Sequence, residues 1–164
     1  SSYVESDLCD AEDLYGKSKN LGEPHPLPHA VTLRTSIIGH ELSSRYALID
    51  WFLSQKYKVK GYVHALYSGL PTIELGRVIR DVVIPDKNLA GLYHVSAQPI
   101  SKYDLLKIVA EIYNKKIIIE PEYTVRIDRT LCSTRFQEQT GYRAPAWPTL
   151  IEAMHQSRTL VGAV

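Results

Sequence analysis

The sequence has little of what marks a membrane, nucleic-acid-binding or disulfide-rich protein. Its 164 residues carry a formal net charge of +1, which offers no basic footprint for nucleic acid. No apolar run approaches the roughly 20 residues that cross a bilayer. The two cysteines, Cys9 and Cys132, have the spacing of neither a metal site nor a disulfide framework. We therefore expect a cytoplasmic protein with two reduced thiols and with no membrane or nucleic-acid partner.

The arrangement of glycines excludes the usual turn for a dinucleotide. The nine glycines are scattered, and neither G-x-G-x-x-G nor G-x-x-G-x-x-G occurs. Such a turn lets the backbone approach a pyrophosphate ahead of a helix N-terminus. The histidines lack convincing zinc spacing, so we expect no metal site. We interpret His94 as a core or rim residue, whereas His40 follows the end of a predicted strand and could face a cleft.

What the chain does contain is an alternation of strand-like and helical segments. Apolar and β-branched runs predict strands at 30–39, 57–68, 91–96 and 115–121. Helical periodicity and capping residues predict helices at 9–23, 44–56, 72–83, 101–114, 133–140 and 147–157. This alternation is typical of an α/β fold with a parallel sheet.

Several of these helices have predicted caps at their starts. Asp10 is expected to cap the first helix, because its carboxylate can accept from free backbone N–H groups. Ser101 with Asp104, and Thr149 with Glu152, have the spacing of capping boxes. These residues fix where we expect each helix to begin.

Two tyrosine–lysine pairs have a spacing that suits proton transfer. Tyr15 and Lys19 lie in "YGKSK", and Tyr103 and Lys107 lie in "YDLLK". A spacing of four places both side chains on one helix face. A tyrosine hydroxyl can donate a proton to a carbonyl oxygen while hydride reaches the carbon, but its ordinary pKa of about 10 is high for this task. A nearby ammonium lowers that pKa and can also bind the ribose of a nicotinamide cofactor.

The residues between each tyrosine and lysine distinguish the two pairs. Apolar residues surround the second pair, so we interpret Tyr103 as a packing residue and Lys107 as a solvated charge. Gly16 and Ser18 lie within the first pair. Both are poor choices for a structural helix interior, but they suit a place where a cofactor approaches the backbone. The first pair is therefore the catalytic candidate.

Longer stretches of the sequence resemble a known family. "YGKSKNLGE" followed by "TLRTSIIG" resembles the tyrosine helix and next strand of the extended short-chain dehydrogenase/reductase superfamily. Four later stretches are similar, in order and spacing, to its dTDP-4-dehydrorhamnose reductase branch: "SGLPTIELGRVI", "GLYHVSAQPISKYDLLKIVAEIY", "DRTLCSTRF" and "TGYRAPAWPTLIEAM". The resemblance covers nearly the whole chain.

This resemblance implies a fold class and a division of the chain. It implies an α/β protein that comprises the C-terminal part of a Rossmann-type NAD(P)-binding fold and a small mixed α/β substrate-binding lobe. Residues 1–39 would be the remaining elements of the nucleotide-binding domain. Residues 40–164 would be mostly the sugar-nucleotide lobe, some of whose elements could return to the Rossmann sheet.

The resemblance also implies catalytic and cofactor-binding residues. Tyr15 and Lys19 match the catalytic tyrosine and lysine, which also contact the NADP or NAD cofactor. Arg34, Thr35 and Ser36 match the strand end that flanks the nicotinamide and the sugar. Arg34 could equally be a structural ion-pair partner.

Substrate-binding residues follow from the same resemblance. Ser36 would contact the sugar as well as the cofactor. The stretch "YSGLPT" matches a loop that lines the sugar-nucleotide cleft, so Tyr67 and Thr72 are candidates there. For Thr72 we favour a plain helix cap as the alternative role.

The resemblance further implies that part of the enzyme lies outside this chain. The glycine-rich turn and the catalytic serine or threonine would precede residue 1. We therefore expect a fragment that is inactive alone and that associates with another copy or with the missing N-terminal half. The expected activity is NAD(P)-dependent reduction of a nucleotide-linked 4-keto sugar. A sugar-nucleotide epimerase or dehydratase stays open as an alternative, as does a non-catalytic, reductase-like regulatory subunit.

Overall fold

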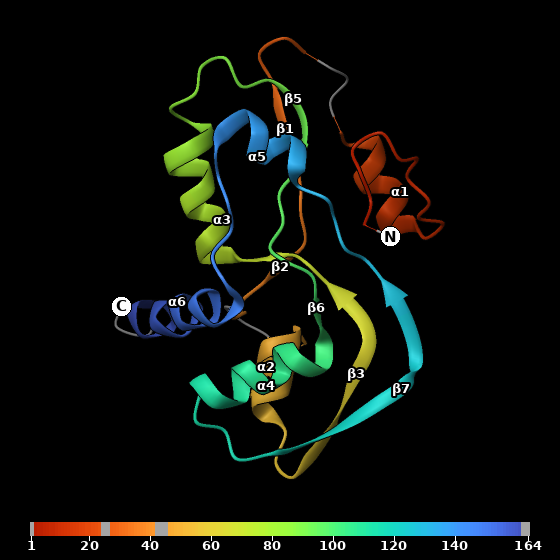
Figure 1. Ribbon diagram of the computed structural model, residues 1–164, viewed down its shortest axis with the longest axis vertical. Coiled ribbons are helices and arrows are strands. Elements are labelled where there is room, and N and C mark those ends of the chain that lie inside the picture. The colour runs from red at the N-terminus through yellow and green to blue at the C-terminus, as the bar shows by residue number, and fades with distance from the viewer. Residues whose placement is uncertain (1, 24–26, 42–45, 162–164) are drawn as a thin grey trace.

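The computed structural model describes residues 2–23, 27–41 and 46–161, and it has the expected α/β class (Figure 1). The helices are α1 (Leu14–Leu21), α2 (Leu48–Ser54), α3 (Thr72–Val78) with its π-helical continuation η1 (Ile79–Val83), α4 (Lys102–Ile112), α5 (Thr134–Thr140) and α6 (Trp147–Val161). The strands are β1 (Val31–Arg34), β2 (Ile37–Ile38), β3 (Lys58–Tyr67), β4 (Leu70–Pro71), β5 (Gly91–His94), β6 (Ile100–Ser101) and β7 (Ile118–Asp128).

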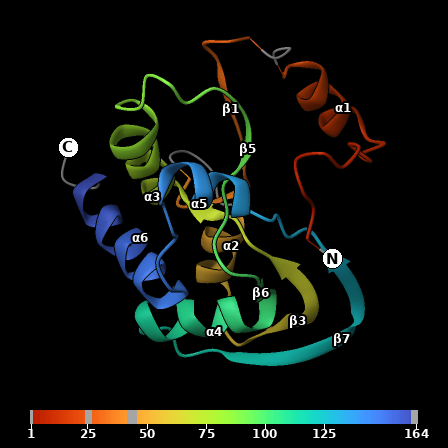
Figure 2. The same ribbon diagram turned by 45° about the horizontal axis from the view of Figure 1, so that its top comes forward.

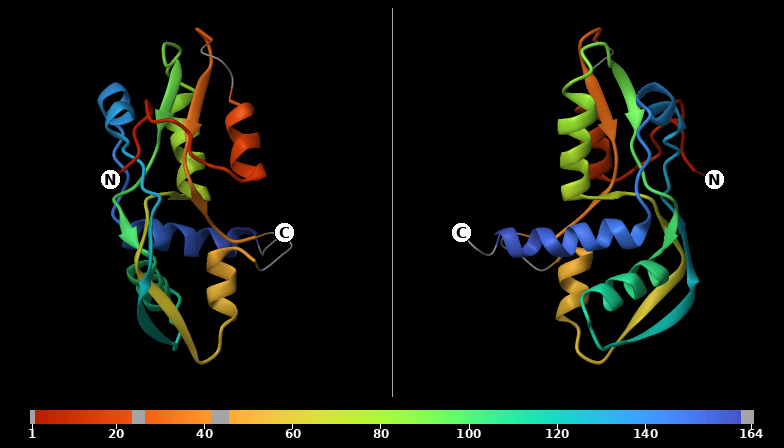
Figure 3. Two further views of the ribbon diagram at one scale, coloured as in Figure 1. Left: turned by 90° about the vertical axis from the view of Figure 1, so that its right-hand side faces the viewer. Right: turned by 60° about the vertical axis from the view of Figure 1, so that its left-hand side comes forward.

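Strands β1 and β5 form a parallel pair at one end of the molecule. The register places Arg34 opposite His94, so both strands end at the same level. Helix α5 packs against β5, and α1 stands beside β1 at the margin of the molecule (Figure 3). No other strand in the described part of the chain pairs with the free edge of β1. The same holds for the outer edge of β5, so the pair is a piece of parallel sheet with two open edges among the described residues.

The strand predicted at 30–39 is divided into two. Thr35 and Ser36 interrupt it, and β2 then pairs in parallel with β4 rather than continuing beside β5. The carbonyl oxygen of Ser36 accepts a hydrogen bond from the backbone N–H of Leu70 at 2.8 Å. Because of this break, residues 31–38 contribute β1 to one small sheet and β2 to another.

The third sheet has the order β6–β3–β7. Strand β7 pairs in parallel with β3 and lies at the edge, where the sequence predicted the strand at 115–121. Helix α4 covers one face of β3 (Figure 2). Tyr103 packs there against Gly61, where an added Cβ would lie 2.7 Å from the tyrosine ring. Between Tyr62 and His64 the register shifts, so that residues 123–125 of β7 face a single residue of β3 and form a bulge.

A single cluster of buried side chains connects these sheets. It extends from Tyr93 on β5, through Ile49 and Phe52 on α2, to Leu105 on α4 and Ile151 on α6. Helix α6 packs against both α3 and α4. The parallel pair that carries the candidate site therefore rests on the same core as the third sheet.

The first helix begins later than predicted. Its cap is Asp13, whose Oδ1 accepts a hydrogen bond from the backbone N–H of Gly16 at 2.6 Å. The prediction that Asp10 caps this helix is wrong. The Oδ2 atom of Asp10 instead accepts a hydrogen bond from the hydroxyl of Tyr3 at 2.8 Å. Residues before Asp13 form an irregular segment that passes beside α1.

Of the caps predicted at Ser101 and Thr149, the first is confirmed and the second is wrong. Ser101 caps α4, because its Oγ accepts a hydrogen bond from the backbone N–H of Asp104 at 3.0 Å. Helix α6 already begins at Trp147, which places Thr149 inside its first turn. The capping box predicted from Thr149 and Glu152 is therefore wrong.

Candidate functional site

Helix α1 presents Tyr15 and Lys19 together. The Nζ atom of Lys19 lies 5.6 Å from the centre of the Tyr15 ring, as a spacing of four predicts. Tyr15 is exposed over 72% of its surface, and α1 has no buried residue. In the second pair the corresponding distance, from Lys107 Nζ to the Tyr103 ring, is 5.3 Å. The two pairs share one geometry, and the packed surroundings of Tyr103 are what separate them.

Gly16 has a packing reason within the chain. A Cβ built on Gly16 would lie 2.2 Å from the Cβ of Ala11, in the segment that passes beside α1. Real side chains do not approach so closely, so the helix needs glycine at this position. The sequence interpretation, which assigned this glycine to cofactor approach, is therefore not needed to explain it.

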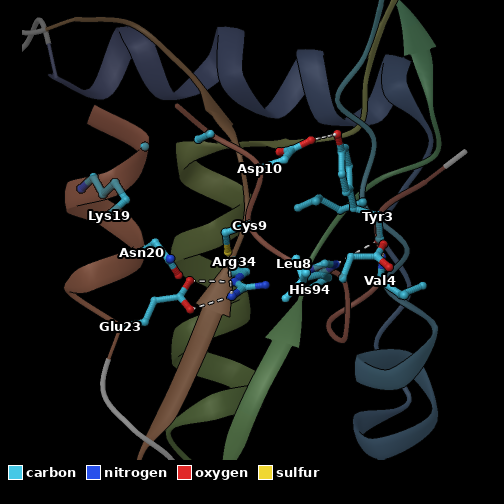
Figure 4. Close-up of a pocket in the computed structure, with 14 residues that line it drawn as sticks. Tyr3, Val4, Leu8, Cys9, Asp10, Lys19, Asn20, Glu23, Arg34 and His94 are labelled. Atoms are coloured by element: carbon cyan, nitrogen blue, oxygen red, sulfur yellow. Dashed lines mark hydrogen bonds and ion pairs between the residues drawn. The ribbon is translucent and has the colours of Figure 1, made fainter. Parts of the chain in front are cut away.

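A cavity of about 250 Å³ opens at the carboxyl ends of β1 and β5 (Figure 4). Its walls come from the segment before α1, from one side of α1 and from the two strand ends. Lys19, Arg34 and His94 line it, whereas Tyr15 does not. Carboxyl ends of parallel strands are where open α/β sheets bind ligands. The cavity is therefore the candidate site of this chain.

Arg34 enters the cavity wall as part of an ion pair. Its Nε and Nη2 atoms each donate to one carboxylate oxygen of Glu23, both at 2.7 Å. This bidentate geometry is a strong form of charge-assisted hydrogen bond. The guanidinium of Arg34 lowers the pKa of Glu23, and the carboxylate raises the pKa of Arg34. Nη2 also donates to Cys9 Sγ at 3.4 Å. The structure thus confirms that Arg34 forms a structural ion pair, the alternative role that the sequence left open for it.

His94 is buried in the cavity wall at the end of β5. Its backbone N–H donates to Glu5 Oε1 at 2.7 Å, and its Nδ1 lies 3.1 Å from the carbonyl oxygen of Tyr3. A carbonyl oxygen only accepts, so Nδ1 carries the proton and Nε2 is bare in the neutral ring. Nε2 is buried and has no partner among the described residues. The interpretation of His94 as a core or rim residue is confirmed.

Thr35 and Ser36 do not line the cavity. They form the step between β1 and β2, where Thr35 Oγ1 donates to the carbonyl oxygen of Ser36 at 3.2 Å. Their predicted contacts with cofactor and sugar stay predictions.

Tyr67 and Thr72 lie beyond that step, and neither lines the cavity. Thr72 Oγ1 donates to the carbonyl oxygen of Ile38 at 3.2 Å, while Pro71 occupies the cap position of α3. The helix-cap role that we favoured for Thr72 is therefore wrong. The Tyr67 hydroxyl is buried without a partner among the described residues, and burial raises its pKa. Its ring packs beside that of Trp147, with 5.9 Å between the ring centres.

His40 joins helices instead of lining the cavity. Its Nδ1 lies 2.8 Å from Asp50 Oδ1 on α2, and its Nε2 lies 2.8 Å from the hydroxyl of Tyr113 at the end of α4. Burial raises the pKa of Tyr113 to about 12, so its hydroxyl remains protonated at neutral pH. These contacts give His40 a structural role.

Sequence reasoning missed Glu23 and Cys9 as cavity residues. Nothing in the spacing of Glu23 and Arg34 signals an ion pair, because the two residues come together only in three dimensions. His94 had a usable signal. The stretches "VTLR" and "GLYH" each end in a polar residue after an apolar run, and parallel pairing places such ends side by side.

Two other kinds of site are missing from the described part of the chain. No cluster of three or more histidine, cysteine or acidic residues there is arranged to hold a metal ion. No helix there is long and apolar enough to cross a membrane. Cys9 and Cys132 are free thiols.

Comparison with known proteins gives matches among solved structures only. No protein-family profile and no curated protein matches the chain. The chain is similar to dTDP-4-dehydrorhamnose reductase from Bacillus anthracis in complex with NADP, with a TM-score of 0.74 and 17% identity over 95% of this chain. A dTDP-4-dehydrorhamnose reductase from Clostridium acetobutylicum has a TM-score of 0.74 and 17% identity over 97% of this chain. A UDP-N-acetylglucosamine 4-epimerase from Bacillus cereus has a TM-score of 0.62 and 13% identity over 87%.

The chain spans only part of the length of these proteins. It covers 59% of the Bacillus anthracis reductase, 60% of the Clostridium reductase and 50% of the epimerase. The chain therefore has the fold of the carboxy-terminal part of a short-chain dehydrogenase/reductase-like protein, as found in dTDP-4-dehydrorhamnose reductases.

Proposed function

We propose that this chain is the carboxy-terminal part of an NAD(P)-dependent reductase that acts on a nucleotide-linked 4-keto sugar. The observation that carries the proposal is the position of the tyrosine–lysine pair. Lys19 lines a cavity at the carboxyl ends of two parallel strands, and Tyr15 lies over the same lysine on α1. The reductases of the same fold supply the reaction class.

In this proposal Tyr15 is the general acid. Its hydroxyl donates a proton to the keto oxygen as the carbonyl carbon is reduced, which leaves a phenolate. The ammonium of Lys19 stabilises that phenolate through its positive charge. Lys19 makes no ion pair with any residue in the described ranges, so its charge is available for this role.

The cavity fits one end of a nicotinamide cofactor. The Lys19 ammonium can donate hydrogen bonds to ribose hydroxyls. Three carboxylates, those of Asp7, Asp10 and Glu23, accompany Lys19 and Arg34 in the wall, and this surplus of negative charge disfavours phosphate. The ribose and nicotinamide therefore suit this cavity, and the pyrophosphate needs a site elsewhere. When bound, the cofactor supplies the hydride.

We propose that the remaining predicted residues belong to the substrate side of the site. Ser36, Tyr67 and Thr72 lie on or near the β2–β4 pair, next to the strand end that carries Arg34. We propose that Thr35 flanks the nicotinamide and that these three residues flank the sugar. The step between β1 and β2 would separate the two halves of the site.

A sugar-nucleotide epimerase is the second candidate. The match to the Bacillus cereus epimerase supports it, but with a lower TM-score than either reductase. The tyrosine–lysine pair serves both reactions and does not discriminate. An epimerase recycles its cofactor, so a purified protein that carries oxidised cofactor and turns over without added NADPH would favour this second reaction.

The test is NADPH oxidation by the complete polypeptide that contains this chain, with a dTDP-4-keto sugar as substrate. Tyr15→Phe removes only the hydroxyl and is expected to lower kcat by about 10²- to 10⁴-fold, the usual contribution of a general acid. Tyr103→Phe is the matched control, because that tyrosine has the same lysine geometry but a packed environment. Turnover that survives Tyr15→Phe nearly intact would overturn the mechanism.

A further inference from the structure

We infer that Nε2 of His94 is a ligand-binding acceptor in the cavity, which takes a hydrogen bond from a neutral N–H or O–H group of the bound molecule. This inference rests on the proposed function, because it takes the cavity as part of the cofactor and sugar site. It adds a residue that the tyrosine–lysine pair does not include.

The tautomer of His94 fixes what Nε2 can do. The Tyr3 carbonyl oxygen, 3.1 Å from Nδ1, requires the proton on Nδ1. The neutral ring therefore offers a lone pair at Nε2. A buried acceptor without a partner costs free energy, and such atoms in native structures call for a ligand, water or ion. Because His94 lines the cavity, a molecule bound there is the partner that the geometry suggests.

The carboxylates of the cavity wall are already engaged. Asp7 accepts from the backbone N–H of Val4, Asp10 accepts from the Tyr3 hydroxyl, and Glu23 accepts from Arg34. In the same wall, the side chains of Lys19 and Asn20 and the Nε2 atom of His94 have no hydrogen bond to another described residue. Of these, His94 Nε2 is the buried acceptor, and a donor group of a bound molecule would satisfy it.

The need for a hydrogen-bond donor next to Nε2 limits the chemical groups that can bind there. A phosphate or carboxylate has no proton to give to Nε2 and would be repelled by the carboxylates in the wall. A carboxamide and a sugar hydroxyl each carry a neutral N–H or O–H donor. The first belongs to the nicotinamide of the cofactor and the second to the substrate, so the two sources share one hydrogen-bonding pattern.

The ligand must also reach a nitrogen that neighbouring groups cover. His94 Nε2 is buried in the free chain, so a ligand reaches it only when the cavity wall around it moves.

The direct experiment is a long-range ¹H–¹⁵N spectrum of histidine imidazoles in the complete polypeptide, with NADP⁺ and dTDP-rhamnose added separately. The free protein is expected to show the Nδ1-protonated tautomer for His94. A change of the His94 Nε2 resonance on adding NADP⁺ assigns the partner to the carboxamide, and a change on adding dTDP-rhamnose assigns it to a sugar hydroxyl. If neither probe moves that resonance at saturation, the inference is wrong.

Two variants separate ligand binding from a structural role. Asparagine reaches about as far as Nδ1, so His94→Asn keeps a donor for the Tyr3 carbonyl and loses the acceptor. Glutamine reaches about as far as Nε2, so His94→Gln keeps the acceptor and loses the Tyr3 contact. We expect His94→Asn to weaken binding of the active probe about 10-fold, the effect of one lost hydrogen bond, and His94→Gln to bind more tightly than His94→Asn. The reverse order would show that the ring is only structural.

His64→Asn on the face of β3 controls for the substitution itself, because that ring contacts Tyr123 and not the cavity. If His94→Asn does not fold, the spectrum of the wild-type protein still decides the question. These readouts are binding and protonation, so a protein that binds the probes but reduces nothing would overturn the proposed function and leave the His94 inference standing.

Discussion

Arg34 and His94 occupy paired positions at the ends of adjacent parallel strands, and both side chains line one cavity. Arg34 is tied to Glu23, and His94 is tied to Tyr3 through Nδ1. Both tethers come from the segments on either side of Tyr15 and Lys19. The cavity is therefore held by the same stretch of chain that presents the tyrosine–lysine pair.

The ion pair of Glu23 and Arg34 makes stability depend on pH. The pKa of Glu23 is lowered from its ordinary value of 4.5 by hydrogen bonds from Arg34. A lowered folded-state pKa contributes stability that is complete above the ordinary value and is lost as the pH falls through the folded value. Glu23→Gln should therefore be less stable than wild type at neutral pH, and the difference should shrink in acid.

Urea unfolding between about pH 6 and about pH 3 measures this difference. Glu138→Gln is the control, because it removes an exposed carboxylate of α5 that has no ion pair within the described ranges. A constant gap between wild type and Glu23→Gln across this range would contradict the prediction.

Gly16 and Gly76 offer a matched pair of glycine substitutions in helices. Gly16→Ala places a methyl group against Ala11, only 2.2 Å away, and is expected to destabilise the chain by about 1–3 kcal/mol through overpacking. A Cβ at Gly76 in α3 meets nothing within 4 Å, so Gly76→Ala should stabilise by roughly 0.5–1 kcal/mol. Thermal unfolding of both variants tests this, and equal effects of the same sign would refute the packing reason.

Ser101 and Thr149 test the two cap assignments. Ser101→Ala removes the acceptor for the backbone N–H of Asp104 and should cost about 1 kcal/mol. Thr149→Ala changes an exposed residue inside the first turn of α6 and should stay within about 0.5 kcal/mol of wild type. Denaturant midpoints compare the two variants. A larger loss at Thr149 would restore the capping box that the sequence predicted.

The 164-residue chain alone should bind NADPH only weakly. It has no glycine-rich turn for the pyrophosphate, and the cavity wall carries more carboxylates than cations. A titration of the isolated chain followed by cofactor fluorescence should show no saturation in the micromolar range, unlike the complete polypeptide. Micromolar affinity of the isolated chain would mean that another part of this surface holds the phosphates.

The sequence predicted the α/β class, the helices and most strands because these depend on local periodicity. Helix α4 illustrates this, since Ser101 and a repeating apolar face define it without reference to distant residues. The break at Thr35 and Ser36 could not be foreseen, because it is set by pairing with β4, more than thirty residues away. Asp10 failed as a cap for the same reason, since Tyr3 competes for its carboxylate.

Near the candidate site, the spacing of Tyr15 and Lys19 predicted that the two side chains lie together on α1. The contacts of Arg34 with Glu23 and of His94 with Tyr3 could not be predicted from spacing. A bidentate ion pair between residues 11 positions apart, and a histidine whose tautomer is set by a backbone carbonyl, both depend on folded geometry. The structural role of a single residue was also harder to predict than the helix or strand in which it lies. Gly16, for example, has a packing contact with Ala11 that the sequence did not reveal.

The bulge at residues 123–125 affects how copies of this chain would aggregate through their edge strands. An edge strand with a regular row of free backbone groups invites a second strand and, at high concentration, aggregation. The bulge interrupts that row on β7, and the nearby charges of Glu122 and Arg126 oppose flat stacking. The free edge of β1 has no such bulge. We therefore expect strand-mediated aggregation of the isolated chain to begin at the β1–β5 pair and to spare β7.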